Sequence, residues 1–417
     1  MLKILRSNDK ADIEALFSRR SVRMSEAEAV VAPILEAIRE RGDAALVEYA
    51  RKFDGLEGDS VRVTPDRMRA AAEAVDDALR EAVAIASEQI RAYAKLQLPK
   101  EWTQQIGDGV WLGQIVRPLE SIGAYIPGGR YPLPSTLMMT VIPAQEAGVK
   151  TISAASPAMS PATLGVAGIL GVDNFFHMGG AQAIAAFAFG TETVPKVQRI
   201  VGPGNIYVAA AKKILAGETG IDFLAGPTEI LLISTDGDPR HLSADILAQA
   251  EHDVDAAAIL LTTSREHAER VVAEVETQLA SLPTADVARQ AVDRNSAVVV
   301  CNSLAEACEI SNRFAPEHLS IPSAELLPQI ENAGSVFVGA WSPEAAGDYA
   351  SGPNHVLPTG GTAALRGGLS ILDYVKIISV QELTPDGLRR LAPSITRLAR
   401  AEGLEAHARS VEVRLDD

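Results

Sequence analysis

The segment IGAYIPGG, residues 122–129, decides the expected fold because an apolar stretch leads directly into a Pro-Gly-Gly turn. Residues 122–126 predict a buried strand that ends at this turn. Further along, short apolar stretches alternate with Ala-rich segments of helical spacing. We expect strands at 150–155, 174–178 and 199–201, and helices at 136–147, 161–170, 181–189 and 206–216. This alternation predicts right-handed crossovers and a mostly parallel sheet.

A second α/β set follows the first and is also expected to form a sheet. Its strands are expected at 229–233, 256–262, 297–301 and 335–338, with helices at 243–251, 266–280 and 304–313. Residues before about 100 predict helices, because apolar residues recur three and four apart at 27–40 and 67–96. At the other end, Thr384-Pro385 predicts a helix start, followed by a narrow apolar stripe. A helix so isolated needs a surface to pack on, and a partner subunit is one candidate.

Composition excludes several classes of protein. The 417 residues suggest two to four lobes, and 38 Lys and Arg against 54 Asp and Glu give a net charge of −16. That balance, with only 5% aromatic residues, argues against binding to nucleic acid or to an anionic membrane. Apolar runs are too short to span a membrane, and the N-terminal segment meets charge too early for a signal peptide. Cys301 and Cys308 cannot build a disulfide framework, so we expect two buried thiols and a cytoplasmic protein.

Three glycine turns raise the question of a nucleotide site. Neither the Gly-x-Gly-x-x-Gly fingerprint nor a P-loop is present. The nearest match is Gly202-Pro203-Gly204-Asn205, between an expected strand and an expected helix, where backbone amides could approach a phosphate. The turns at 127–129 and 179–180 occupy equivalent positions, and ligands of open α/β sheets bind at such strand ends. Plain tight turns are an equally good interpretation.

Several polar residues could hold a divalent metal. Gln249 and His252 share a helix face, Asp348 and His355 flank a glycine-rich loop, and His407 lies near Glu402. Spacing alone cannot show that they meet, so scattered polar residues remain an alternative. His267, in a charged helix, is expected at the surface.

An adjacent carboxylate and imidazole, Glu317-His318, lie in the short segment 315–319 between an expected helix and an expected strand. Histidine is the usual proton acceptor near neutral pH, and the glutamate could act as a second base, for instance on water. The alternative interpretation is an incidental surface pair.

These stretches together resemble the histidinol dehydrogenase family from about residue 20 to the C-terminus. The matching segments are YIPGG at 125–129, GGAQAIAA at 179–186, VGPGN at 201–205, LAGP at 224–227, QAEH at 249–252, APEHL at 315–319, AGDYASGPNHVLPT at 346–359 and LEAH at 404–407. So many matches in the same order make coincidence a poor explanation.

The resemblance implies two incomplete Rossmann-like α/β domains with N- and C-terminal helical extensions in an intertwined homodimer. The implied boundaries are an N-terminal helical arm at 1–22, a catalytic domain at 23–124 and 230–369, an NAD-binding domain at 125–229 and a C-terminal dimerisation arm at 370–417.

The resemblance also implies the site residues. Glu317 and His318 are the implied proton-transfer residues. Zinc is bound by Gln249, His252, Asp348 and His407, the last from the partner subunit. NAD is contacted by Tyr125, Gln182 and Asn205, and the substrate, L-histidinol, by Thr228, Gln249, His252, His318, Asp348, Glu402 and His407.

Two positions depart from the family pattern. Thr228 stands where the family usually has Ser, which keeps the hydroxyl, and Arg130-Tyr131 differs from the commonest residues after the turn.

Two rival hypotheses remain: a zinc- and NAD-dependent dehydrogenase of another primary alcohol, and a metal-stabilised sensing module without catalysis. Manganese or cobalt could replace zinc with such ligands.

Overall fold

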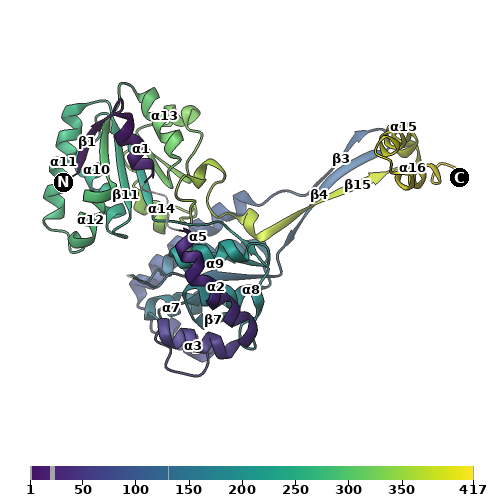
Figure 1. Ribbon diagram of the computed structural model, residues 1–417, viewed down its shortest axis with the longest axis horizontal. Coiled ribbons are helices and arrows are strands. Elements are labelled where there is room, and N and C mark those ends of the chain that lie inside the picture. The colour runs from purple at the N-terminus through teal and green to yellow at the C-terminus, as the bar shows by residue number, and fades with distance from the viewer. Residues whose placement is uncertain (1, 19–23, 130, 417) are drawn as a thin grey trace.

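Two six-stranded sheets form the cores of two α/β lobes, and a long arm projects from them (Figure 1). The computed structural model describes residues 2–18, 24–129 and 131–416, so Arg130 lies outside the described residues. The expected mostly parallel sheets flanked by helices are confirmed. Among the described residues, no helix combines the length and the apolar character needed to cross a membrane.

The first lobe is built on a sheet with strand order β2-β7-β6-β5-β8-β9. All neighbouring strands are parallel except the β2–β7 pair. The strands are β2 (Arg62–Val63), β5 (Ser121–Tyr125), β6 (Thr151–Ser156), β7 (Asn174–His177), β8 (Arg199–Val201) and β9 (Gly220–Ile221). Its helices are α2 (Met24–Arg41), α3 (Asp43–Phe53), α4 (Pro65–Glu73), α5 (Asp77–Gln97), α6 (Pro134–Ala147), α7 (Pro161–Leu170), α8 (Gly180–Phe189) and α9 (Ile206–Leu215).

The second lobe has an all-parallel sheet with order β1-β12-β11-β10-β13-β14. The strands are β1 (Lys3–Arg6), β10 (Glu229–Ile233), β11 (Ala257–Thr262), β12 (Ala297–Val300), β13 (His318–Ile321) and β14 (Ser335–Val338). The helices are α1 (Lys10–Ser18), α10 (Pro239–Ala250), α11 (Arg265–Leu279), α12 (Ala285–Asn295), α13 (Leu304–Phe314) and α14 (Glu344–Tyr349), with short 3-10 turns η1 (Ala324–Gln329), η2 (Thr362–Ala364) and η3 (Ile371–Tyr374) before the arm.

The arm is an antiparallel ribbon that carries two helices at its tip (Figure 1). Its strands are β3 (Trp102–Gly107), β4 (Val110–Pro118) and β15 (Val375–Leu383), and the tip holds α15 (Pro385–Ala401) and α16 (Glu405–Glu412). Thr384 caps α15 by accepting a hydrogen bond from the backbone N–H of Gly387, and Pro385 opens the helix, as the sequence predicts.

The packing differs from the expected domain boundaries, which joined residues 23–124 to 230–369. Helices α2–α5 pack on the first lobe, where Glu28 pairs with Lys213 of α9 and Arg39 with Glu218. Gly168 of α7 lets α4 approach so closely that a Cβ there would lie 2.5 Å from the Met68 carbonyl oxygen. The N-terminal segment is not only helical, because β1 pairs with β12 of the second lobe.

His267 also differs from expectation. It is fully buried on α11, because the helix turns this face, together with Ala268 and Val271, toward the sheet of the second lobe. Burial lowers the pKa of its imidazole. A charged neighbourhood in the sequence therefore did not indicate an exposed side chain.

Candidate metal and proton-transfer site

The helical pair α10 and α14 brings a possible metal-binding group together. One ligand atom each of His252, Glu344 and Asp348 lies within 4.8 Å of the others. His252 follows the end of α10, and Glu344 and Asp348 stand four residues apart on α14, so they share one face. The Nε2 atom of His252 lies 4.0 Å from Oδ2 of Asp348. The expected proximity of His252 and Asp348 is therefore present within one chain.

Gln249 is fully buried beside this group. Its Nε2 donates to the hydroxyl oxygen of Thr228 at 2.7 Å, and its amide oxygen lies 2.7 Å from Oε1 of Glu344 and accepts from that carboxyl group when it is protonated. Thr228 Oγ1 also lies 2.6 Å from Oε2 of Glu317. A continuous line of polar groups therefore joins Glu344 to Glu317 through Gln249 and Thr228.

The geometry of His318 leaves one ring nitrogen available for chemistry. Its Nδ1 lies 3.2 Å from the carbonyl oxygen of Glu229, which can only accept, so Nδ1 carries the proton. Its Nε2 is buried without a hydrogen-bond partner among the described residues and lies 3.8 Å from Oδ1 of Asp348. Burial lowers the pKa of His318 to about 4. The ring is therefore a neutral imidazole with its lone pair toward the possible metal-binding group.

Local backbone geometry brings Glu317 and His318 to this position. Helix α13 ends at Ala315, whose φ of 47° makes it the one non-glycine residue with positive φ among those described. This left-handed cap turns the chain so that His318 starts β13, between β10 and β14. An alanine held in this conformation is strained, and such strain is typical of functional sites.

Glu317 is buried and accepts two hydrogen bonds from the β10 side. The backbone N–H of Glu229 donates to its Oε2 at 2.9 Å, and Thr228 donates at 2.6 Å. Burial raises the pKa of Glu317 well above its ordinary value, although these two hydrogen bonds oppose the shift. The carboxyl group can therefore exchange a proton closer to neutral pH than a free glutamate. The surface-pair interpretation of Glu317-His318 is wrong because both side chains are buried.

Sequence reasoning missed Glu344. It is 3% exposed, and burial, followed by the charges of Asp348 and Glu317, raises the pKa of its carboxyl group well above the ordinary value. The signal that could have found it is its spacing of four residues before Asp348, directly after Pro343. Apart from this spacing, nothing in the sequence around Glu344 indicated that its carboxyl group is buried.

His355 lies beside the site but has a different partner. Its Nδ1 donates to the backbone carbonyl of Asp348 at 2.7 Å, and its Nε2 lies 3.1 Å from the hydroxyl of Thr136 on α6. Burial lowers the pKa of the imidazole. His355 therefore fixes the segment that carries Asp348 to the first lobe.

The three glycine turns lie at the carboxyl ends of β5, β7 and β8 in the first lobe, as predicted. The hydroxyl of Tyr125 accepts from the backbone N–H of Gly180 at 3.1 Å, and burial raises the pKa of this phenol to about 12. Gln182 is buried in the first turn of α8, and the side chain of Asn205 caps α9 by accepting from two backbone N–H groups. These residues lie at the carboxyl-terminal edge of the sheet, at or just after the ends of β5, β7 and β8.

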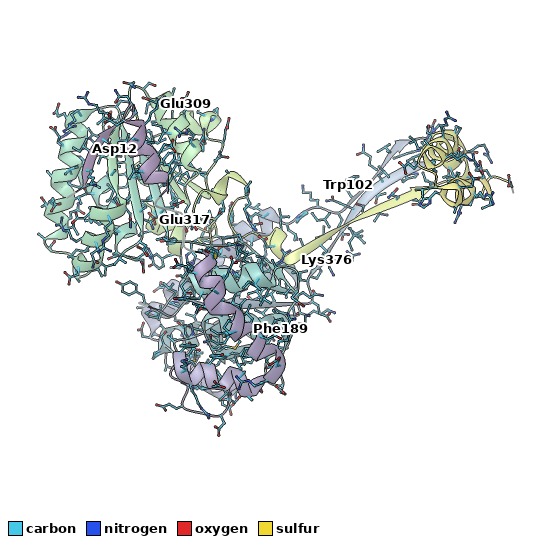
Figure 2. All side chains as sticks on the ribbon, in the orientation of Figure 1. Asp12, Trp102, Phe189, Glu309, Glu317 and Lys376 are labelled. Carbon is cyan, nitrogen blue, oxygen red and sulfur yellow. The ribbon has the colours of Figure 1, made fainter. Side chains whose placement is uncertain are left out.

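The structure does not bring Glu402 and His407 to the other site residues of the same chain. They lie on the α15–α16 tip, at the far end of the arm from Glu317, which lies where the two lobes approach each other (Figures 1 and 2). A set of ligands that includes His407 would therefore have to be completed by a second copy of the chain.

The chain is similar to known proteins over almost its whole length. The family model described as histidinol dehydrogenase matches residues 17–415. The histidinol dehydrogenase of Geobacter sulfurreducens is 47% identical over 425 residues, with 99% of each chain covered. That of Thermus thermophilus is 48% identical over 411 residues, covering 97% of this chain and 98% of the relative.

A solved structure extends the likeness to the fold. The crystal structure of histidinol dehydrogenase from Elizabethkingia anophelis matches with a TM-score of 0.95 and 38% identity, covering 100% of this chain and 98% of that one. The likeness includes the projecting arm as well as both lobes, because nearly all of both chains is matched. The resemblance inferred from the sequence is thus confirmed, and the chain belongs to the histidinol dehydrogenase family.

Proposed function

We propose that the protein oxidises L-histidinol to L-histidine with NAD, through L-histidinaldehyde, as the last steps of histidine biosynthesis in the cytoplasm. The observation that carries this proposal is the unpartnered Nε2 of His318, buried 3.8 Å from Asp348 in a member of this family. A dehydrogenase needs such a base beside the alcohol that loses hydride. A sensing module without catalysis would not need it.

The side chains present fit a zinc ion. His252 supplies nitrogen, Asp348 and Gln249 supply oxygen, and His407 of the partner subunit would complete a four-ligand set. Zinc held there would bind nitrogen atoms of L-histidinol and fix the alcohol carbon, without a redox role. Glu344 lies within the same group and contacts the amide of Gln249, so it would orient the amide oxygen of Gln249 toward the metal.

The two proton transfers are assigned to His318 and Glu317. In the first oxidation, His318 Nε2 takes the hydroxyl proton while hydride leaves the alcohol carbon, which gives the aldehyde. Glu317 then takes a proton from water as the water adds to the aldehyde carbon. The hydrate anion formed in this way loses a second hydride to give the carboxylic acid, which releases its proton to solvent and becomes the carboxylate. NAD would accept hydride in each of the two oxidations.

The first lobe is the proposed NAD-binding part, with contacts from Tyr125, Gln182 and Asn205. The substrate would contact Thr228, the metal ligands and His318, and also Glu402 of the partner subunit. The active form is therefore a homodimer in which each arm completes the site of the other copy.

The stoichiometry of the reaction tests this function. Incubation of the purified protein with L-histidinol and NAD should yield two NADH and one L-histidine per L-histidinol, and a chelator should abolish the reaction. We expect Glu317→Gln and His318→Gln each to lower turnover by at least about a hundredfold. Glu331→Gln, an exposed control on the same lobe, should keep normal turnover. Near-normal turnover in both site variants contradicts the assignment, and elemental analysis identifies the metal.

A further inference from the structure

Asp54, which the sequence did not single out, connects the helical N-terminal segment to the proposed NAD edge. It caps the C-terminus of α3, and its Oδ2 accepts from the backbone N–H of Gly179 and from Nε2 of Gln182, both at 2.9 Å. The ring of His177 in turn lies 2.9 Å from the backbone carbonyl of Asp54. One carboxylate thus holds both the turn at the end of β7 and a side chain of α8.

This contact fixes the orientation of the Gln182 amide. The opposite orientation would place the amide oxygen against a carboxylate oxygen, where both groups can only accept. Gln182 is 2% exposed, so its side chain has little freedom to turn away. Its Oε1 receives no hydrogen bond from the residues that the structure describes, and this atom is not completely buried. Gln182 therefore presents a free acceptor at this edge.

We propose that Asp54 is a positioning residue for NAD, which holds Gln182 so that its Oε1 accepts a hydrogen bond from an uncharged donor of the dinucleotide. The inference rests on the proposed function only in placing NAD at this edge. Three kinds of donor have the right chemistry: a ribose hydroxyl, the adenine amino group and the carboxamide N–H of the nicotinamide. ADP-ribose carries the first two and lacks the third, so it separates them from the carboxamide.

Calorimetric titration of the purified dimer with NAD tests the proposal without turnover. We expect Asp54→Ala to weaken NAD binding about tenfold, because Gln182 can then turn its donor outward. Asp54→Asn should bind nearly as well as wild type, because its amide oxygen can replace Oδ2. The KM for L-histidinol should stay unchanged in both. An equal loss for ADP-ribose places the donor in the ADP-ribose part, on a ribose hydroxyl or the adenine amino group, and a loss confined to NAD identifies the carboxamide.

A double-variant cycle separates positioning from general damage. If Asp54 acts through Gln182, then Asp54→Ala should have no further effect on NAD affinity in a Gln182→Ala protein. The matched control is Asp43→Ala at the other end of α3, where the carboxylate accepts from the hydroxyl of Thr191 at 2.5 Å, remote from the turn. It should lower stability and leave NAD affinity unchanged.

Three results would overturn the proposal: an Asp54→Ala protein that binds NAD like wild type, additive losses in the double variant, or an Asp43→Ala protein that loses as much affinity as Asp54→Ala. If Asp54→Ala fails to fold, the NAD affinities of Asp54→Asn and Gln182→Ala are compared instead. An Asp54→Asn protein that binds NAD as weakly as Gln182→Ala would contradict the proposal, because the asparagine still offers an acceptor to Gln182. Failure of the wild type to bind NAD would instead contradict the proposed function.

Discussion

Lys212 and Asp222 form an ion pair of 2.6 Å in which both side chains are almost completely buried. The pair surrounds Gly202: its backbone N–H donates to Oδ2 of Asp222 at 2.8 Å, and its carbonyl accepts from Lys212 at 2.5 Å. Gly202 has φ of 109°, a conformation that glycine adopts without strain. The turn that carries Asn205 is therefore fixed by charge as well as by backbone geometry.

Loss of the lysine alone should be costly, because it leaves the Asp222 carboxylate buried without a counter-charge. We expect Lys212→Met to lower the free energy of unfolding by about 3–5 kcal/mol, measured by urea denaturation. The double variant Lys212→Met/Asp222→Asn should lose less. Lys213 lies on α9 beside Lys212 and pairs with Glu28 of α2 at the surface. Lys213→Met should therefore lower the free energy of unfolding by less than about 1 kcal/mol. Equal losses for Lys212→Met and Lys213→Met would contradict this account.

The two cysteines should be inert in the folded protein. Cys301 is 4% and Cys308 2% exposed, and burial raises the pKa of the Cys301 thiol to about 12 and that of Cys308 in the same direction. Only the thiolate reacts, so we expect no modification by a disulfide reagent at pH 8. Both thiols should titrate in denaturant. Rapid labelling of one thiol in the native protein would show that this part of the second lobe opens.

Asp245 should make stability depend on pH. It lies on α10, and burial raises the pKa of its carboxyl group to about 6, opposed by His241. Because the folded pKa lies above the unfolded one, this contribution to stability is fully present below about pH 4 and is lost as the pH rises through 6. Asp245→Asn removes the dependence. Between pH 5 and pH 8, the stability of the variant relative to wild type should rise by about 1 kcal/mol.

Urea denaturation at both pH values, with a chelator present to exclude metal binding near α14, measures this difference. A variant whose stability follows that of wild type in parallel from pH 5 to pH 8 would mean that Asp245 is ionised at little cost in the folded protein.

The sequence predicted the central strands of both sheets because those strands are buried on both faces, and it missed the short, partly exposed strands β1, β2 and β9 at or near the sheet edges. Residues 161–170 and 229–233 were expected and occur as α7 and β10 with those bounds, since unbroken apolar stretches between turns have few alternatives. The helix start in the arm was predicted, but the ribbon was missed because its strands lack such a signal: every residue of β3 from Trp102 to Ile106 is exposed. Its pairing of Val110–Pro118 with Val375–Leu383 also joins segments remote in sequence.

The site was predictable where residues lie close together in the sequence. Gln249 and His252 follow from their spacing of three residues, although α10 ends at Ala250 and His252 lies in the turn after it, whereas the roles of Glu317 and His318 needed the resemblance. Asp54 and Glu344 were missed because their significance depends on contacts across the fold, with Gln182 and with Gln249 respectively. Periodicity showed that helices α2–α5 need a partner surface, but it could not show which lobe provides it.

The position of His407 at the arm tip leads to a prediction about mixed dimers. If each arm serves the other copy, a dimer of one His407→Ala chain and one His318→Gln chain keeps one complete site: the His407→Ala chain retains His318 and receives an intact His407 from its partner. If His407 served its own chain, both sites of the hybrid would be defective. Co-expression with two different affinity tags and sequential purification isolates the hybrid.

We expect both parent homodimers to be nearly inactive and the hybrid to recover up to about half of the wild-type turnover per dimer, one intact site out of two. A dual-tagged hybrid of wild type with His318→Gln gives the matched value, because it also retains one complete site. We expect the first outcome because α16, which carries His407, lies at the far end of the arm from Glu317 of the same chain (Figures 1 and 2). A purified hybrid no more active than its parents, beside an active wild-type hybrid, would mean that the arm does not supply His407 across the dimer.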